Sequence, residues 1–150
     1  MREEKRGQAA MEFLMTYGWA ILAAIIVIAV IAIYFRPSTL VSNSVVVSAP
    51  FYGVGVTYSA TQIQVEIRNN GGEDITAVTP TLSISQPSTG TCTAPVAVDM
   101  TAGETTVFTW TGCTGLSSGD TISGDINVGY TRSGSSLPLT SSGSIAGKVA

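Results

Sequence analysis

Glu12 is a carboxylate that stands at the start of a long apolar run, and its position requires a chemical explanation. The 23 residues from 13 to 35 carry no charge. A carboxylate at the centre of a bilayer costs about 2.5 to 3.5 kcal/mol, and less near its edge, so a membrane helix rarely keeps one without a partner. Glu12 therefore either reaches the lipid headgroups at the nearby helix end or pairs with a positive group.

The peptide bond between Gly7 and Gln8 is a candidate source of that positive group. Arg2, Lys5 and Arg6 lie before the bond and the apolar run follows it. A secretory signal peptide has a shorter apolar region and a cleavage site after it. Cleavage at Gly7-Gln8 instead removes a basic leader, leaves the apolar segment on the mature chain and creates an α-amine at Gln8. This amine is a candidate positive partner for Glu12.

The apolar run is long enough to span a membrane. As a helix it extends about 35 Å, which exceeds the hydrocarbon core of a bilayer. The basic residues before it outnumber Arg36, the one basic residue just after it, which predicts a single pass with the N-terminus in the cytoplasm. Pro37 is expected to end the helix, because proline cannot continue its hydrogen-bond ladder.

The N-terminal region resembles that of archaeal type IV pilins, which carry a class III signal peptide. The resemblance covers about the first 36 residues and lies in Lys5-Arg6-Gly7, the following Gln8-Ala9-Ala10-Met11-Glu12-Phe13-Leu14, and the apolar helix. It implies that a prepilin peptidase cuts after Gly7, that Gln8 becomes the first mature residue and that Glu12 becomes the fifth. It also implies a pilus assembly ATPase with its membrane platform, and further copies of the chain in a helical filament, as partners.

Three segments are predicted from these features. Residues 1–7 form the cleaved leader, residues 8–36 the transmembrane and filament-core helix, and residues 38–150 a β-sandwich head. The expected location is the membrane before assembly and an extracellular surface filament afterwards. The predicted function is a structural pilus subunit acting in surface adhesion. The alternative is a minor pilin or a membrane-anchored binding or adhesin domain that never polymerises.

Short strands are expected throughout the head, because β-branched residues alternate with polar ones between turn signals. An α+β fold follows, with one long N-terminal helix and an immunoglobulin-like antiparallel sandwich. Proline within a strand favours an edge or a bend, so the strand containing Pro80 is expected at an edge or in two parts. The expected strands cover residues 41–48, 53–58, 62–68, 75–85, 94–99, 105–110, 121–131 and 145–149.

Two similar passages, 100–105 and 116–121, each have an apolar residue, then a turn that ends in glycine and an acid, then a strand. We interpret both as corners between strands, with the apolar residue closing the end of the core. Trp110 is interpreted as a core residue rather than a ligand platform. The predicted inner face contains Phe108, Trp110, Ile126, Val128 and Tyr130.

Cys92 and Cys113 are the two cysteines, and the predicted topology places both outside the membrane. A metal site would need further thiols or histidines, and the sequence has none. A disulfide is favoured over two free buried thiols, because exposed proteins meet oxidising conditions. It would close a loop of about 20 residues and stabilise the head by about 3 kcal/mol.

The remaining composition indicates neither an enzyme nor a nucleic-acid-binding protein. The chain of 150 residues has 11% charged residues, a net charge of −3 and no histidine to act as a base. A nucleic-acid-binding surface would require a basic patch. No cofactor or metal is expected, since the acids of the head do not follow a calcium-loop spacing. We interpret most of the five acids Glu73, Asp74, Glu104, Asp120 and Asp125 as turn residues in water.

Overall fold

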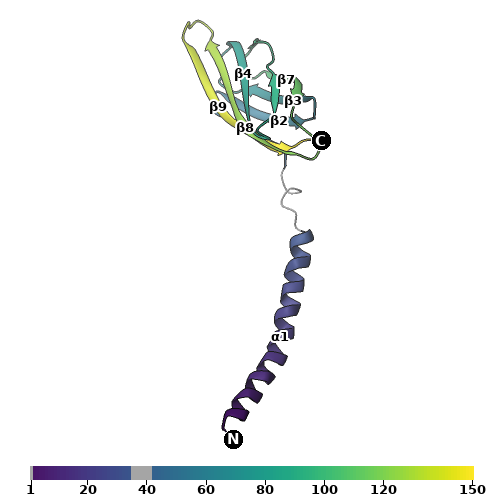
Figure 1. The fold of residues 1–150 in the computed structure, drawn as a ribbon. Coiled ribbons are helices and arrows are strands. Elements are labelled where there is room, and N and C mark those ends of the chain that lie inside the picture. Colours follow the sequence, from purple (N-terminus) through teal and green to yellow (C-terminus); the bar gives the residue numbers. More distant parts are fainter. Residues whose placement is uncertain (1, 35–41) are drawn as a thin grey trace. The chain divides into compact units, whose positions relative to one another are not determined.

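The computed structural model describes residues 2–34 and 42–150, with side chains from residue 7 onward. The chain divides into two compact units, Met1–Leu40 and Val41–Ala150 (Figure 1). The first contains one helix, α1 (Arg2–Tyr34), which runs through the Gly7-Gln8 junction. The expected helix end at Arg36 and Pro37 lies outside the described residues.

The second unit is a sandwich of two antiparallel sheets, which confirms the predicted α+β class and the two-sheet immunoglobulin-like head. The five-stranded sheet has the order β1 (Ser44–Val47), β9 (Pro138–Lys148), β8 (Thr121–Arg132), β4 (Ile75–Gln86) and β6 (Val98–Met100). The four-stranded sheet has the order β2 (Phe51–Tyr58), β3 (Gln62–Asn69), β7 (Thr105–Thr114) and β5 (Thr91–Thr93). Figure 1 shows β4, β8 and β9 on one side of the head and β2, β3 and β7 on the other.

The core lies between the sheets and follows the expected alternation. In β3, Ile63, Val65 and Ile67 are fully buried, while Gln62 and Arg68 are exposed. Neighbouring side chains of a strand point to opposite faces, so this pattern places every second residue in the core. The five residues predicted for the inner face of the later strands are all buried, which confirms them and the core assignment of Trp110.

The two similar corners also form as predicted. Met100 and Leu116 are buried at the starts of these passages. In the first corner, the Glu104 carboxylate accepts a hydrogen bond from the Thr101 N–H at 2.7 Å. In the second, Asp120 accepts one from the Ser117 N–H at 3.0 Å. The acid of each passage thus closes its own turn, which is why the same pattern occurs twice.

The last strand differs from the prediction, which placed a short strand at 145–149. Strand β9 has 11 residues and begins at Pro138. Its serines and glycines lack the apolar alternation that identifies a strand, but close packing requires small residues here. A Cβ on Gly143 would collide with the backbone of β1 at Val46, and one on Gly147 would collide with the ring of Tyr58.

The strand predicted at 94–99 is also wrong in its extent. Residues 94–97 form no strand, and β6 pairs with β4 only at Ile75 and Val78. Between these positions β4 bulges, and Ala77 has a positive φ of 52°. Beyond Val78, β8 is the only sheet neighbour of β4, so Pro80 lies on an open edge as predicted.

Candidate processing and assembly segment

The Gly7-Gln8 junction is an exposed part of α1. A Cβ added at Gly7 would meet no atom within 4 Å. Nothing in the described part of the chain therefore requires glycine at this position. Glycine in a helix interior costs about 1 kcal/mol relative to alanine, so the backbone opens more easily at this point. Both observations hold equally for Gly18, the other glycine of α1.

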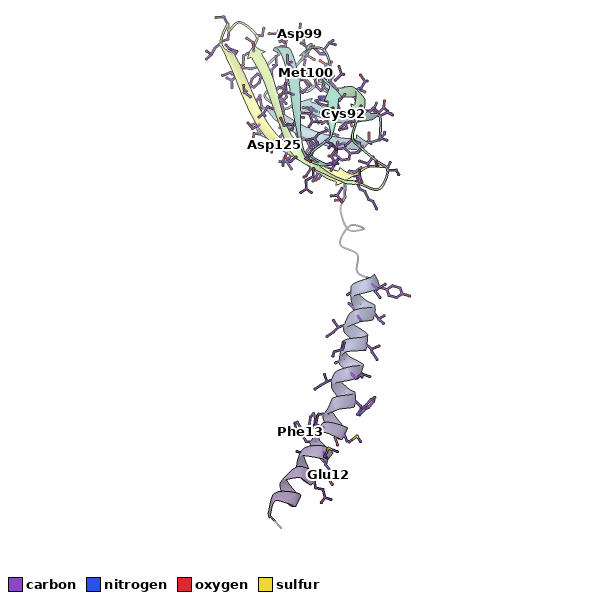
Figure 2. The ribbon with its side chains drawn as sticks, in the orientation of Figure 1. Glu12, Phe13, Cys92, Asp99, Met100 and Asp125 are labelled. Carbon is purple, nitrogen blue, oxygen red and sulfur yellow. A yellow bond between two sulfur atoms is a disulfide. The ribbon has the colours of Figure 1, made fainter. Side chains whose placement is uncertain are left out.

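Glu12 lies one turn beyond Gln8. Residues four apart stand on the same side of a helix, so Gln8 and Glu12 share one face of α1. Figure 2 shows Glu12 projecting from α1 next to Phe13, and the structure exposes both side chains. The Phe13 ring stacks on Tyr17, one turn further on, with ring centroids 4.5 Å apart. The acid is therefore bordered on its C-terminal side by an ordered aromatic pair.

Beyond Glu12, the surface of α1 carries no charged side chain. Only Gly18 and Ala23 are half-buried between Gly7 and Tyr34, and all other side chains in this span are exposed. Sixteen large apolar side chains are among them, with exposed fractions from 47% at Val30 to 83% at Tyr34. A water-exposed helix normally has a polar face, and this one has none. The surface requires an apolar environment, from lipid or from other helices.

Among residues 2–34 and 42–150, one helix is long and apolar enough to cross a membrane or to act as a signal anchor, the 28-residue span Gly7–Tyr34. At about 1.5 Å per residue it extends about 42 Å, more than a hydrocarbon core of about 30 Å. The single membrane helix of the prediction is therefore present by length and composition. A signal sequence near the N-terminus also passes this test of length and composition, so the site of cleavage distinguishes the two.

The predicted disulfide between Cys92 and Cys113 is present, with a Cα–Cα distance of 4.1 Å. It joins β5, an edge strand of three residues, to the long strand β7. Cys113 is buried, and Thr91 and Thr114 form a hydroxyl hydrogen bond of 3.0 Å beside the bridge. The bridge holds β5 in the sheet where few backbone hydrogen bonds are available to do so.

Asn69 has a structural role that the sequence does not reveal. Its side chain is fully buried. The amide donates to the carbonyls of Glu73 at 2.7 Å and Thr101 at 3.0 Å, and its oxygen accepts from the Gly71 N–H at 3.1 Å. The residue therefore joins the turn after β3 to the corner before β7. In the sequence it is indistinguishable from Asn70, its exposed neighbour.

Several acids of the head bind backbone N–H groups. Asp74 accepts a hydrogen bond from Ala102 at 2.9 Å, and Asp99 accepts one from Ala77 at 2.8 Å. Asp99, labelled in Figure 2, therefore holds the bulge of β4 in its unusual conformation. With Glu104 and Asp120, these acids serve turns and bulges. Asp125 is not a turn residue, because it lies within β8 with its side chain exposed.

Comparison with known proteins adds no relative. No protein-family model, no curated protein and no solved structure matches the chain. The function is therefore inferred from the residues and contacts described above.

Proposed function

We propose that the chain is a structural subunit of an archaeal type IV pilus, processed after Gly7 and polymerised through α1, which acts in surface adhesion. One observation carries the proposal: a helix that exposes sixteen large apolar side chains has three basic residues before its Gly7-Gln8 sequence, and after that sequence it carries one acid, Glu12. A plain membrane anchor needs the apolar helix but needs neither the junction nor the acid.

The apolar surface of α1 has to be kept from water both before and after assembly, and helix packing rather than transfer from water then favours the filament. Burying one large aliphatic or aromatic side chain is worth about 1.5 to 3 kcal/mol. Sixteen such side chains exceed the whole stability of a typical small domain, which is about 5 to 15 kcal/mol. Lipid covers this surface before assembly, and helices of neighbouring subunits cover it in the filament. The alanines and Gly18 allow those helices to approach closely.

Cleavage links processing to assembly. The leader carries Arg2, Lys5 and Arg6, which anchor the precursor on the cytoplasmic side and would be costly inside a helix bundle. Its removal deletes these charges and leaves one α-amine at Gln8. This amine and the Glu12 carboxylate then meet between neighbouring subunits, so that the new positive charge compensates the buried negative one.

The disulfide supports the same topology. Disulfides persist outside the cytoplasm, where thiols are not kept reduced. The Cys92–Cys113 bridge lies in the head, which the basic residues of the leader place on the outer side. Two independent features thus support a head on the cell exterior.

Processing is tested by producing the full chain together with a prepilin peptidase. Mass spectrometry should show a mature chain that begins at Gln8. Gly7→Val should leave uncut precursor in the membrane, because a branched side chain replaces the glycine at the cut. The matched control is Gly18→Val, which alters the other glycine of α1 and should leave cleavage intact. A mature N-terminus beyond Phe35 would contradict the proposal, since it would discard the helix.

A further inference from the structure

A small depression of about 310 Å³ opens in the head where the turn before β2 meets the turn after β3. Its volume is at the lower end for small-molecule sites and matches a single sugar ring rather than a large ligand. Aromatic, amide and guanidinium groups line it together, which is the mixture that orients a small polar ligand. The lining includes Pro50, Phe51, Tyr52, Asn70, Tyr130 and Arg132.

Aromatic rings form much of the wall. Of the six aromatic residues between 42 and 150, only Tyr52 is exposed, with 61% of its surface accessible. The rings of Phe51 and Tyr130 are buried and meet edge to face, with centroids 5.1 Å apart. This pair packs in the core and holds the start of β2, and Tyr52, on the opposite face of β2, is the lining residue with an exposed ring.

Positive charge gathers around Tyr52, although the head is acidic. Residues 42–150 contain seven acids and only three basic residues, Arg68, Arg132 and Lys148. Arg132 lines the pocket, and Arg68 is the cross-strand partner of Tyr52. Paired residues of adjacent strands present their side chains on the same face, so Arg68 lies beside Tyr52, while Arg132 reaches the pocket from β8 of the other sheet.

The guanidinium of Arg132 is held only loosely by its acidic neighbour. Its Nε lies 3.9 Å from the Glu73 carboxylate, and the two side chains are 53% and 63% exposed. Exposed ion pairs of this kind contribute little to stability. A ligand carboxylate can replace Glu73 and accept two parallel hydrogen bonds from the planar guanidinium.

Backbone groups near the pocket are already paired, which favours recognition by side chains. The Asn70 N–H donates to the Pro50 carbonyl at 2.9 Å, and the Gly71 N–H donates to the Asn69 side chain at 3.1 Å. An extended peptide usually binds through open backbone groups. A rigid ring that presents an apolar face and a carboxylate matches the available side chains better.

We propose that this pocket binds an acidic sugar unit of a polysaccharide, with the sugar ring on Tyr52 and the carboxylate on Arg132. Two other depressions lack this combination. One of about 560 Å³ is lined by Gln86, Ser88 and Asp120, among others, without an aromatic or basic side chain. One of about 290 Å³ contains Glu66, which repels an anion. The proposal goes beyond the pilus subunit and does not depend on polymerisation.

Binding is measured with the full chain in detergent micelles, using trisaccharides of galacturonic acid and of mannuronic acid as probes. At least one of them should bind, and neutral trisaccharides of galactose and mannose should bind at least tenfold more weakly. Tyr52→Ala and Arg132→Gln should each weaken binding at least tenfold. Glu73→Gln should strengthen it severalfold, because it releases the guanidinium.

Lys148→Gln is the matched control, since it removes one positive charge away from the pocket. It should leave binding unchanged, and thermal unfolding should show that every variant keeps its fold. The proposal is overturned if neither acidic probe binds at millimolar concentration. It is also overturned if Lys148→Gln weakens binding as much as Arg132→Gln, or if a peptide ending in a free carboxylate binds more tightly than both acidic probes.

Discussion

Apolar residues of the same types are exposed to solvent in α1 and buried in the head. In α1, Ile25 is 60% exposed, whereas in the head Ile63 has no exposed surface. The head buries its own apolar side chains between two sheets, while the described part of α1 buries almost none. The head is therefore stabilised by contacts among its own residues, whereas α1 needs contacts with lipid or with other helices. Changes to the head should therefore alter folding, and changes to α1 should alter assembly.

Polar groups show the same contrast. In the head, Asn69 is fully buried and its amide is satisfied by three backbone groups of neighbouring turns. In α1, Glu12 is exposed and borders an apolar surface. A buried polar group needs its partners in place, and those of Asn69 lie within the same chain. Those of Glu12 are expected to come from another subunit.

The largest expected effect is on assembly, from substitutions at Glu12. Removing one partner of a buried ion pair costs about 3 to 5 kcal/mol, so Glu12→Ala should reduce filament yield at least a hundredfold. Glu12→Asp should restore it only in part, because the shorter side chain misplaces the charge. Filaments are counted by electron microscopy, and the melting temperature of the head should not change. Normal yield from Glu12→Ala would show that helix packing alone holds the filament.

Removing the disulfide should have the opposite pattern of effects: it should strongly destabilise the head and leave membrane insertion unchanged. Cys92→Ser with Cys113→Ser should lower the free energy of unfolding of the head by about 3 kcal/mol, because the open chain gains conformational entropy. Denaturant unfolding measures this change. An unaltered midpoint would mean that β5 stays in the sheet without the bridge.

Asn69 and Asn70 offer a direct comparison within one turn. Asn69→Ala leaves buried carbonyls without their donor and should destabilise the head by about 2 kcal/mol. Asn70→Ala, at an exposed position, should change the free energy of unfolding by less than about 0.5 kcal/mol. Equal effects of the two substitutions in chemical denaturation would contradict the role assigned to Asn69.

The smallest effect concerns alkaline pH. Burial raises the pKa of Tyr58 above its ordinary value of 10.0, because the ionised phenol is disfavoured inside the core. The stabilisation is therefore complete below pH 10 and is lost as the pH rises towards the folded-state pKa. Above pH 10 the free energy of unfolding should fall by about 1.4 kcal/mol per pH unit through this group. Tyr58→Phe should flatten that slope, and Tyr52→Phe should not.

The sequence predicts those strands and turns of the head whose own residues show a recognisable pattern. The alternation of Ile63, Val65 and Ile67 is enough to place β3, and the repeated acid in each corner reports a local turn. Strand β9 is different. Gly143 and Gly147 have to be small because Val46 and Tyr58, which are distant in sequence, pack closely against them. Such a strand has no signal of its own.

The candidate sites also differ in whether residues close together in the sequence are enough to identify them. The junction at Gly7, the acid at Glu12 and the pairing of two cysteines can be proposed from residue types alone. The pocket around Tyr52 cannot, because Pro50, Asn70 and Arg132 come from three segments that only folding brings together. Asn69 and Asn70 are adjacent and identical in type, so only the structure shows which one is buried.

The central claim is that the apolar surface of α1 is covered by other copies of the chain after cleavage at Gly7. Cryo-electron microscopy of filaments from cells that produce the tagged chain tests it most directly. The account predicts a core of packed α1 helices that begin at Gln8, surrounded by sandwich heads. Filaments whose subunits lack α1, or a fully processed chain that stays monomeric in the membrane, would contradict it.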